Sequence, residues 1–545
     1  MNSIVNFFLD NGILLNETFL QRVKEENLNS FLNLLNDKLK KKPVFLNEDL
    51  FYVVKNVDKE FDLNWSEFNK SLVLLEKGRD DSLYNAFLDM MEYNLDENKR
   101  KALSNLLGEI KNDEVDFDVE SDVSNNVIIL KSYIEEIKKR EVQDFVIYFR
   151  KRYEALRNIL INRTELQDSI SINRILNKSG KENVSLIGIV NNKTVTKNGN
   201  IIFELEDFSG SIKVIFSSSK KELSVLAKDI VLDEVIGISG INLGDAVFAN
   251  NLFFPDIPLT NELKKLDKEE YVVFTGDLHF GSKMFLQDDF LNFIDWLNLK
   301  YGDKEQKRIA SKVRYVFFVG DLVEGVGIYP GQEEDLLIKD IYKQYEGLAL
   351  LLSKIRKDIK VVLIGGNHDA LRIAEPQPML DKKLAKPIYE LQNVIIGTNP
   401  SIINIASSSN FIGFNVLLYH GFSFPYLAEN IDSVRINGRL DRADLIMKSI
   451  LQKRHLAPSH ESSLYIPDTK GDSLVIDKVP DFFVSGHIHK TSVLNYRGVT
   501  TLGCGCWTKQ TGDQAKRGIV PEPSKVIITN LQTRDVKILN FSKNE

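Results

Sequence analysis

Five short apolar runs in this chain each end in side chains that can bind a metal ion. The runs begin at Tyr271, Val313, Val361, Val416 and Phe482, and the polar residues that follow them are Asp277 and His279, Asp321, Asn367 and His368, His420, and His487 and His489. These positions use five of the chain's seven histidines, which makes coincidence a poor explanation. Carboxylate, imidazole and amide oxygen suit hard and borderline divalent cations, whereas soft metals prefer thiolate. The pattern therefore predicts a metal centre built from strand ends.

The number of candidate ligands exceeds what one metal ion needs. His368 is set aside because its neighbour Asn367 already occupies that strand end. The remaining seven candidates are Asp277, His279, Asp321, Asn367, His420, His487 and His489. A tetrahedral site takes four ligands, so we expect two ions that share a carboxylate. Two metals roughly 3.5 to 4 Å apart lower the pKa of a shared water and hold a phosphodiester for in-line attack. Mn²⁺ is the first expectation, with Mg²⁺, Fe²⁺ or Zn²⁺ as alternatives.

Buried strands and the helices between them must position these residues. The apolar run at 361–364 leads into two glycines, which is typical of a buried strand followed by a sharp turn. Polar residues just past such a strand lie on loops held by a rigid scaffold, where ligands and catalysts usually lie. Helical periodicity predicts helices over 286–299 and 335–355. Alternating strands and helices, followed by a β-rich part after about residue 400, predict a layered α/β sandwich.

The whole chain reads as a multidomain α/β protein of four parts. They are a small helical domain at 1–45, a charged linker with helices at 46–178, an OB-fold barrel at 179–258, and the sandwich at 262–545. Within the second part, residues 113–126 are acidic and poor in aliphatic side chains, which indicates a flexible linker. Residues 129–161 carry an apolar face at helical spacing, so we expect a helix there.

The barrel prediction depends on strand number and on the place of one helix. Residues 179–258 contain five short strands separated by turns, and a helical pattern at 220–227 follows the third strand. Such barrels often bind single-stranded nucleic acid through stacked aromatic side chains. The aromatic set is small here: Phe203, Phe208, Phe216 and Phe248. DNA contact and a purely structural role therefore both stay open.

Bulk composition excludes several classes of protein. A formal net charge of −7 and a pI near 5.7 argue against a protein that coats nucleic acid by overall charge. No apolar run approaches the roughly 18–20 residues needed to span a bilayer, and the first residues do not resemble a signal peptide, so we expect a cytoplasmic protein. Cys504 and Cys506 flank a single glycine, which is not a usual zinc spacing. We interpret both as small buried residues.

The metal-type residues resemble the five motifs of the calcineurin-like metallophosphoesterase superfamily, in the same order. The matching motifs are Asp277-x-His279, Gly320-Asp321, Gly366-Asn367-His368-Asp369, His420 and Gly486-His487-x-His489. The resemblance implies an α/β/β/α phosphoesterase sandwich. It also implies that Asp277, His279 and His489 hold one metal, that Asn367, His420 and His487 hold the other, and that Asp321 bridges both.

The same resemblance implies catalytic roles for residues beside the ligands. In the superfamily, the histidine that matches His368 donates to the phosphoryl oxygens and protonates the leaving alkoxide. General acid help of this kind is worth about 10²- to 10⁴-fold. The acid that polarises such a histidine lies three residues after the bridging aspartate, which is Glu324 in this chain. Asp369 is the rival for that role, and loop capping is the alternative for both acids.

Longer runs resemble the small subunit of archaeal family-D DNA polymerase. They are residues 320–333, 367–378 and 453–458, and the stretch from Cys506 through Pro521 to the end, so that the resemblance covers roughly 180–545. It implies a metal-dependent 3′→5′ proofreading exodeoxyribonuclease that acts on primer–template and single-stranded 3′ DNA. It further implies a separate large catalytic subunit, which binds the C-terminal part of the phosphoesterase domain and the barrel, and no contact with a membrane.

Two other functions and several DNA contacts complete the expectations. A stand-alone nuclease or phosphatase of the superfamily is one alternative, and a non-catalytic polymerase scaffold is another. Related scaffold subunits have lost metal ligands, whereas this chain keeps every motif residue. Basic side chains that can hold DNA phosphates near the metals are Lys453, Arg454, His455, Lys509, Lys516 and Arg517, and ordinary surface positions are the alternative for them. Arg372 can face the substrate or form a structural ion pair. For Trp507 we favour a core or interface position over stacking on DNA.

Overall fold

The structure is a computed structural model that describes residues 14–15, 45–46, 127–134, 138–178, 180–516 and 519–542. The chain divides into two compact units, Met1–Glu120 and Ser121–Glu545. In the first unit the described residues form a short parallel pair, β1 (Leu14–Leu15) and β2 (Phe45–Leu46). The rest of the helical domain predicted for 1–45, and the linker predicted for 113–126, lie outside the described residues.

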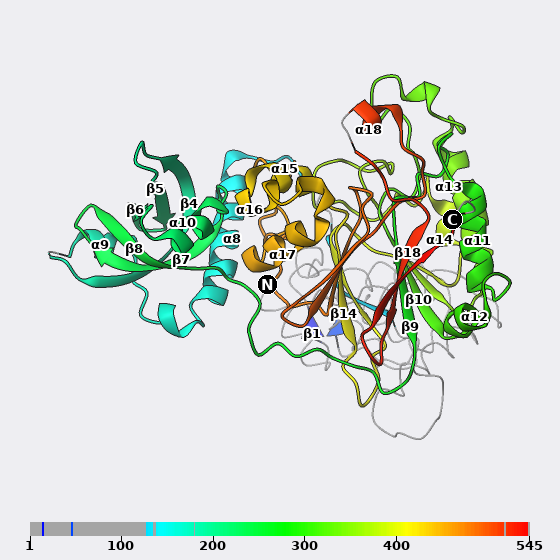
Figure 1. Ribbon diagram of the computed structural model, residues 1–545, viewed down its shortest axis with the longest axis horizontal. Helices are drawn as coiled ribbons and strands as arrows, with labels where there is room; N and C mark the ends of the chain where they lie inside the picture. Colours follow the sequence, from blue (N-terminus) through cyan, green and yellow to red (C-terminus); the bar gives the residue numbers. More distant parts are fainter. Residues whose placement is uncertain are drawn as a thin grey trace, which may run out of the picture. The chain divides into compact units, whose positions relative to one another are not determined.

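Two six-stranded sheets form the centre of the second unit (Figure 1). The strands of the first sheet, in spatial order, are β12 (Val394–Ile396), β11 (Lys360–Ile364), β10 (Val313–Val319), β9 (Tyr271–Thr275), β18 (Lys525–Asn530) and β19 (Val536–Asn540). Those of the second sheet are β16 (Ser492–Tyr496), β17 (Val499–Gly503), β15 (Phe482–Ser485), β14 (Phe414–Leu418), β13 (Ser401–Ile405) and β3 (Val127–Lys131). The strands β9 to β12 run parallel, whereas β18 and β19 are antiparallel.

Alternating side chains of each strand build two different cores. In β9, Val272 and Phe274 face the second sheet, whereas Tyr271 and Val273 pack against helices. The helices α11 (Gln287–Leu297), α12 (Lys304–Ser311), α13 (Ile341–Leu352) and α14 (Lys386–Tyr389) cover the first sheet, and α15 (Phe424–Asn430), α16 (Asp432–Arg435) and α17 (Ala443–Lys453) cover the second (Figure 1). The layers therefore follow the order α/β/β/α, with strands buried on both faces.

One predicted helix begins later than its apolar pattern indicated. The pattern predicted a helix from residue 335, but α13 begins at Ile341. The Asp340 side chain accepts hydrogen bonds from the backbone N–H groups of Tyr342 and Lys343, at 2.8 and 3.2 Å, and so caps the helix. The residues before it are held elsewhere, because the N–H groups of Leu337 and Ile338 donate to the carbonyl of Gly281.

A closed barrel of five strands precedes the sandwich. Its spatial order is β4 (Asn183–Val195), β5 (Ile201–Asp207), β6 (Gly210–Phe216), β8 (Ala246–Phe253) and β7 (Val235–Asn242), and α10 (Lys221–Lys228) follows the third strand. All five predicted strands and the predicted helix are present. Phe203 and Phe216 are fully buried in the barrel core, whereas Phe208 is 60% exposed. The predicted aromatic set is thus largely core, with Phe208 as the exposed member.

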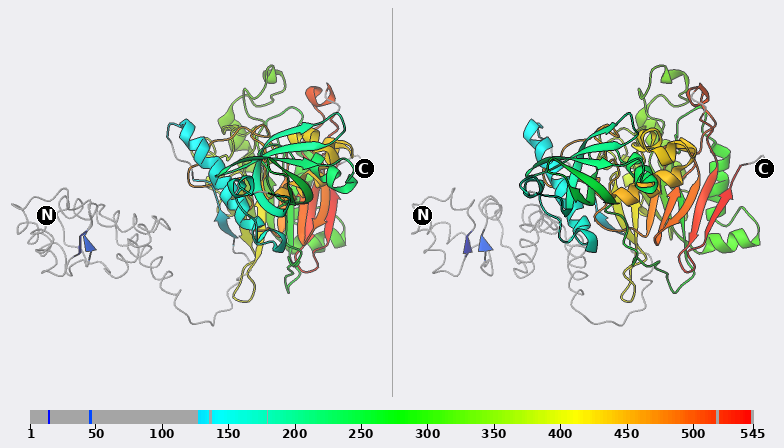
Figure 2. Two further views of the ribbon diagram at one scale, coloured as in Figure 1. Left: turned by 90° about the vertical axis from the view of Figure 1, so that its left-hand side faces the viewer. Right: turned by 60° about the vertical axis from the view of Figure 1, so that its left-hand side comes forward.

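The prediction of a helix over residues 129–161 is wrong at its start. Val127–Lys131 forms β3, which pairs antiparallel with β13 at the edge of the second sheet. A run of β-branched and aliphatic residues fits a pleated sheet edge better than a helix. The helix α8 begins at Val142 and ends at Leu160. It packs against the barrel through Leu156 and Leu160. Figure 2 shows this helix in cyan beside the barrel strands.

A buried cluster of charged and polar groups joins α8 to the sandwich. The Arg152 Nε donates to Asp472 Oδ2 at 2.7 Å, and the Tyr148 hydroxyl donates to Asp472 Oδ1 at 2.8 Å. His455 Nε2 lies 2.8 Å from Asp472 Oδ2, and Arg152 also donates to the carbonyl of Pro458. The guanidinium and carboxylate are almost wholly removed from water, so their mutual pairing is essential.

This cluster gives the protein a specific sensitivity to acid. Burial and the neighbouring Arg152 lower the pKa of His455 to about 4, whereas the unfolded histidine titrates near 6.5. As pH falls from 6.5 to 4, the unfolded chain gains a proton that the folded chain does not bind. We expect a loss of about 2–3 kcal/mol in the free energy of unfolding between pH 7 and 4.5. Urea denaturation across this range should show a smaller loss for His455→Gln, and equal losses would contradict the assignment.

No helix in the described parts of the chain combines the length and apolar character needed to cross a membrane.

Candidate metal centre

The predicted ligands meet at one edge of the two facing sheets. Parallel strands bring their carboxyl ends to the same edge, and each predicted residue lies just past such an end. The first sheet supplies Asp277 and His279 after β9, Asp321 after β10 and Asn367 after β11, and the second supplies His420 after β14 and His487 and His489 after β15. The structure therefore brings all seven predicted ligands together.

Three of these residues form a first group of converging side chains. A carboxylate oxygen of Asp277 and one ring nitrogen from each of His279 and His489 lie within 4.8 Å of one another. The Nε2 atoms of the two histidines are only 3.2 Å apart, and His489 Nε2 lies 3.5 Å from Asp277 Oδ1. All three side chains are buried.

A second group of converging side chains lies directly beside the first. Ligand atoms of Asp321, His420 and His487 lie within 4.8 Å of one another. His420 Nε2 is 3.0 Å from Asn367 Oδ1 and 3.2 Å from Asp321 Oδ2. The same Oδ2 atom of Asp321 lies 3.8 Å from His279 Nε2, so Asp321 stands between the two groups.

The backbone at these positions is strained. Five of the predicted ligands have positive φ angles: Asp277 at 51°, His279 at 50°, Asp321 at 46°, His487 at 71° and His489 at 55°. Non-glycine residues rarely adopt this left-handed conformation, which costs of order 1–3 kcal/mol each. Such strain persists only where the surrounding structure holds it, and it clusters at functional sites.

Two glycines allow the close approach of the loops. A Cβ atom on Gly366 would lie 2.3 Å from Asp321 Oδ1, and one on Gly486 would lie 2.4 Å from Asp277 Oδ2. Both distances are far below any real contact, so a side chain at either position would displace a predicted ligand. The glycines that precede Asn367 and His487 are thus required by packing.

The donor set fits divalent metal ions. Two imidazole nitrogens that face each other at 3.2 Å, with carboxylates beside both, are typical of ligands that share an ion. His420 Nδ1 lies 3.0 Å from the carbonyl of Val319, which leaves Nε2 as the nitrogen for a metal. Calcineurin-like phosphoesterases use divalent metals, and the groups found here suit that chemistry.

The charges of the site are strongly coupled. Burial alone would raise the pKa of Asp321, but the facing His420 and His368 hold it well below its ordinary value. Burial lowers the pKa of His487 to about 3, with His420 adding to the effect. Asp321 outweighs burial at His420 and raises its pKa to about 9. A carboxylate between the two groups therefore stays ionised, as a bridging ligand must.

His368 lies beside the predicted ligands but is oriented differently from expectation. Its Nδ1 atom lies 3.0 Å from the backbone carbonyl of Glu324, whereas the nearer carboxylate oxygen of Glu324 is 3.9 Å away. The other carboxylate oxygen of Glu324 lies 3.0 Å from Nδ1 of His279. The side chain of Glu324 thus supports a predicted metal ligand, and its backbone supports His368.

Asp369 holds the loop together instead of orienting His368. Its carboxylate accepts hydrogen bonds from the backbone N–H groups of Gly366, Leu322 and Val323, at 2.8 to 3.3 Å. Burial, with Asp321 nearby, raises its pKa to about 7. Loop capping, the alternative role considered for this acid, is the one its contacts match.

The predicted DNA contacts at Lys453, Arg454 and His455 are wrong, because all three side chains are at most 4% exposed. Lys453 Nζ lies 2.7 Å from Glu234 Oε1 of the barrel, and Arg454 Nε donates to the carbonyl of Ile476 at 2.6 Å. His455 belongs to the Asp472 cluster. These residues join the barrel and α8 to the sandwich and do not reach solvent.

The other predicted DNA contacts have different outcomes. Arg372 donates to the backbone carbonyls of Ala374 and Pro376, and its guanidinium lies over the Tyr133 ring, so it has a structural role. Lys509 is exposed. The side chain of Lys516 and all of Arg517 lie outside the described residues. Trp507 is buried and donates to Thr275 Oγ1 at 2.8 Å, which confirms the favoured core position.

One residue near the site was not found from the sequence. The side-chain amide of Gln514 lies 3.0 Å from Nδ1 of His489, and it comes from α18 (Gly512–Lys516). Such contacts fix the ring of a metal-binding histidine. No local pattern distinguishes this glutamine from a surface residue, because the contact arises only when the C-terminal segment folds back over the site.

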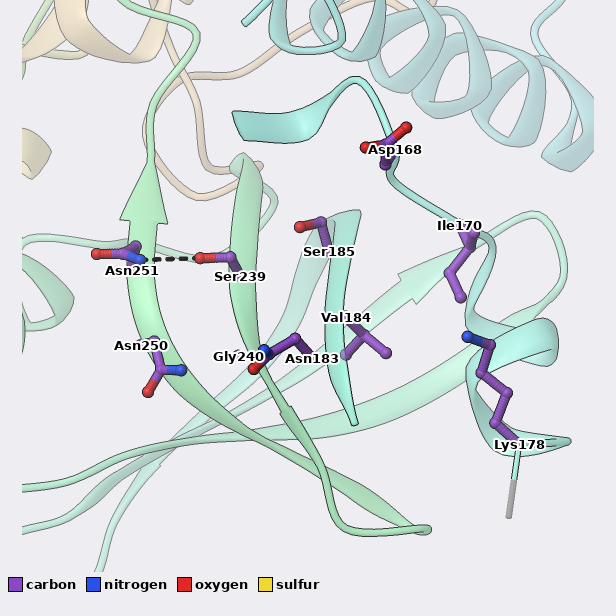
Figure 3. A pocket seen from close by; sticks show the side chains of 10 residues that line it. All are labelled: Asp168, Ile170, Lys178, Asn183, Val184, Ser185, Ser239, Gly240, Asn250 and Asn251. Carbon is purple, nitrogen blue, oxygen red and sulfur yellow. Dashed lines mark hydrogen bonds between the residues drawn. The ribbon is translucent and has the colours of Figure 1, made fainter. Parts of the chain in front are cut away.

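Two of the hollows on the second unit lie at the metal centre and on the barrel. One, of about 600 Å³, opens at the metal centre and is lined by His279, Asp321, Asn367, His368, His487 and His489 among others. The other, of about 410 Å³, lies on the barrel between β4, β7 and β8 (Figure 3). Its lining residues include Asn183, Ser239 and Asn251, and none of the metal-type groups found in the described residues lies there. The metal-type groups found in the described residues therefore lie at the first of these two hollows.

Comparisons with known proteins agree with this site. Residues 271–491 match the family model described as calcineurin-like phosphoesterase. The chain is 39% identical over 429 residues to the DNA polymerase II small subunit of Methanothermobacter thermautotrophicus, which covers 79% of this chain and 84% of that protein. It is 36% identical over 405 residues to the protein of the same name from Pyrococcus horikoshii, covering 74% of this chain and 63% of the relative. A third relative of that name, from Archaeoglobus fulgidus, is 35% identical over 387 residues, which cover 71% of this chain and 75% of that protein.

Proposed function

This chain belongs to the family of DNA polymerase II small subunits, and we propose that it is the proofreading 3′→5′ exodeoxyribonuclease of a two-subunit replicative DNA polymerase. The predicted family is thereby confirmed, whereas the activity is our proposal. The observation that carries it is the convergence of all seven predicted ligands at one site, where five of them line a cleft together with His368. A phosphoesterase site kept complete in this way has the parts for hydrolysing a phosphodiester.

The proposed ligand sets follow two of the three groups of converging side chains; the third group joins His279 and Asp321 to His368, which we assign to proton donation. Asp277, His279 and His489 would hold one divalent ion, Asn367, His420 and His487 the second, and Asp321 both. When bound, two such ions lower the pKa of a shared water and stabilise the charge on the phosphate. Mn²⁺ is the proposed physiological ion, with Mg²⁺, Fe²⁺ and Zn²⁺ as the alternatives.

His368 supplies the proton in this proposal. Its Nδ1 contact with the carbonyl of Glu324 fixes the ring plane, and that leaves Nε2 for the substrate. In the reaction, water adds to phosphorus, the bond from phosphorus to the 3′ oxygen breaks, and that oxygen takes a proton. His368 gives this proton from Nε2 as an imidazolium, which is protonated on both ring nitrogens; burial lowers the pKa of His368, whereas the nearby Asp321 carboxylate favours the charged form. Glu324 acts through its backbone on His368 and through its carboxylate on His279.

The barrel and the C-terminal part are assigned to binding. The strand order of the barrel, 1-2-3-5-4 in chain order with a helix after the third strand, supports an OB fold. The large catalytic subunit is the proposed partner, docked on the barrel and the C-terminal part of the phosphoesterase domain. Primer–template and single-stranded 3′ ends are the proposed nucleic acid substrates.

The decisive experiment is digestion of a 3′-mismatched primer–template by the purified full chain. The protein is stripped with EDTA and then supplied with Mn²⁺ or Mg²⁺, and the 5′-labelled primer is followed on a gel. We expect loss of single nucleotides from the 3′ end in the presence of metal and none in EDTA. The partner large subunit is added in a parallel series, because the activity of the pair can exceed that of the chain alone.

Other outcomes point to the alternatives. No digestion in any metal, with or without the large subunit, would contradict the nuclease and leave a polymerase scaffold. Faster hydrolysis of phosphoprotein or small phosphomonoesters than of the primer would favour a stand-alone phosphatase. Cleavage inside the strand would retain a nuclease but exclude proofreading.

A further inference from the structure

The cleft at the metal centre has a second wall that takes no part in metal binding. Besides five of the seven predicted ligands and His368, the described lining includes the apolar and aromatic side chains of Ile328, Tyr329, Pro330, Pro425, Leu440 and Ile488, with Glu324 and several uncharged hydroxyl and amide groups beside them. None of the described lining residues is a lysine or an arginine. The described walls therefore offer apolar and aromatic contacts, which suit a base or a sugar better than a phosphate.

The size of the cleft limits what can enter it. Its volume of about 600 Å³ lies within the range of roughly 300–1,000 Å³ that is usual for small-ligand pockets. One nucleotide is a ligand of that size. A base pair carried on a duplex is not, since the major groove alone is about 12 Å wide. A single unpaired nucleotide can reach the metal centre, whereas an intact duplex end must stay outside.

The loop at 325–331 is fixed firmly at its base. Gly325 donates its N–H to Gln344 Oε1 at 2.9 Å and accepts from Gln344 Nε2 at 3.1 Å. Gln332 donates to the carbonyl of Glu324 at 3.0 Å and accepts from the N–H of Ile328 at 2.9 Å. Both glutamines are at most 1% exposed. The loop therefore presents its tip to the cleft in one preset conformation.

Tyr329 is the aromatic residue at this tip. Its hydroxyl donates to Asp335 Oδ2 at 2.9 Å and lies 3.4 Å from Glu324 Oε1, so the far end of the ring is anchored. The ring centroid lies 6.3 Å from that of His368, at an interplanar angle of 60°. The side chain is only partly buried and lines the cleft. The anchored ring therefore stands beside the proposed proton donor, His368.

We propose that the loop at 325–331 forms a nucleobase subsite, in which the ring of Tyr329 stacks on the base of the terminal nucleotide. The subsite rests on the proposed nuclease function, because that base belongs to the nucleotide whose phosphate is attacked. Stacking is sequence-tolerant, since every base has an aromatic face. The subsite therefore selects an unpaired end of any sequence, and a mispaired terminus enters more readily than a paired one.

The test compares two oligonucleotides that differ only at the 3′ terminus. One single strand ends in an ordinary nucleotide, and the other ends in an abasic tetrahydrofuran residue. Dissociation constants are measured by fluorescence anisotropy with Ca²⁺ in place of the reactive metal, and KM and kcat are measured with Mn²⁺. The full-length variants are Tyr329→Leu, which removes the ring, and Tyr329→Phe, which keeps it. Tyr342→Leu serves as the control, because Tyr342 is 57% exposed on α13 and does not line the cleft.

Stacking of one base on an aromatic ring predicts the size of the effect. We expect the wild type to bind the ordinary end roughly 5- to 100-fold more tightly than the abasic end. Tyr329→Leu should bring this ratio close to one, and Tyr329→Phe and Tyr342→Leu should leave it unchanged. The kcat for the abasic strand should be the same in the wild type and in Tyr329→Leu.

Two results would overturn the subsite. One is a ratio near one in the wild type, or the same ratio in the wild type and Tyr329→Leu. The other is an equal loss of kcat on both strands in Tyr329→Leu, which would make Tyr329 a support for Glu324 and not a base contact. A failure of the nuclease itself is distinguishable, because the wild type would then digest neither strand while the binding ratio would still decide the subsite.

Discussion

His368→Ala is expected to lower the rate of 3′ nucleotide release by about 10²- to 10⁴-fold, the usual worth of a general acid. The change removes the imidazole but keeps the backbone N–H of residue 368, which donates to Asp321 Oδ1 at 2.8 Å. The bridging carboxylate should therefore stay in place. Metal content, measured by mass spectrometry after dialysis, should match that of the wild type.

The clearest control for this prediction is a substrate whose leaving group needs no proton. A 4-nitrophenyl phosphodiester releases a phenolate that needs no proton, so we expect His368→Ala to lose far less activity on it than on DNA. His460→Ala is the matched variant. His460 is an exposed histidine in the loop after α17, and it pairs with Asp233. Equal losses on both substrates, or a loss of bound metal, would instead make His368 a ligand.

The second large effect is on the free energy of unfolding, and it concerns the buried pair of Arg152 and Asp472 outside the cleft. Arg152→Ala leaves the buried Asp472 carboxylate without its main cation, and breaking a buried pair in this way costs about 3–5 kcal/mol. We expect a loss of that size in the free energy of unfolding, measured by urea denaturation at pH 7.5. The exposed Lys151 on the same helix is the control, since Lys151→Ala breaks only its surface pair with Glu154.

A double variant separates pairing from packing. If the charges of Arg152 and Asp472 act mainly on each other, Arg152→Ala combined with Asp472→Ala should cost less than the sum of the single changes. Strict additivity would mean that the two side chains act independently, through packing and through their separate contacts with Pro458 and Tyr148.

The strand ends could be predicted from the sequence because their signal is local. Each short apolar run fixes a strand, and the direction of parallel strands places the residue after each run at the same edge. Asp321 and Asn367 follow neighbouring strands, so topology alone brings them close. His420 and His487 required a second sheet to face the first, which periodicity does not specify. For them the motif resemblance supplied what local rules could not.

The wrong predictions share a physical cause. Lys453, Arg454 and His455 form a basic run, and such runs are usually solvated. Here the run ends α17 and is buried, because Glu234 at the barrel pairs with Lys453 and Asp472 of the sandwich pairs with His455. The role of Glu324 could not be predicted from spacing either. Its distance along the chain from Asp321 places it near His368 but does not show whether its carboxylate or its backbone carbonyl contacts that histidine.

The position of β18 also bears on protein synthesis. This strand pairs with β9, the strand that leads to Asp277, although some 250 residues separate them along the chain. Trp507, which precedes α18 and β18 in the chain, donates its backbone N–H to the carbonyl of Asp277. A ribosome makes residues in order, so β9 cannot pair with β18 until Lys525–Asn530 has left the exit tunnel. Translation that stops between His489 and Lys525 yields a fragment with all seven predicted metal ligands but without the strand that completes their sheet.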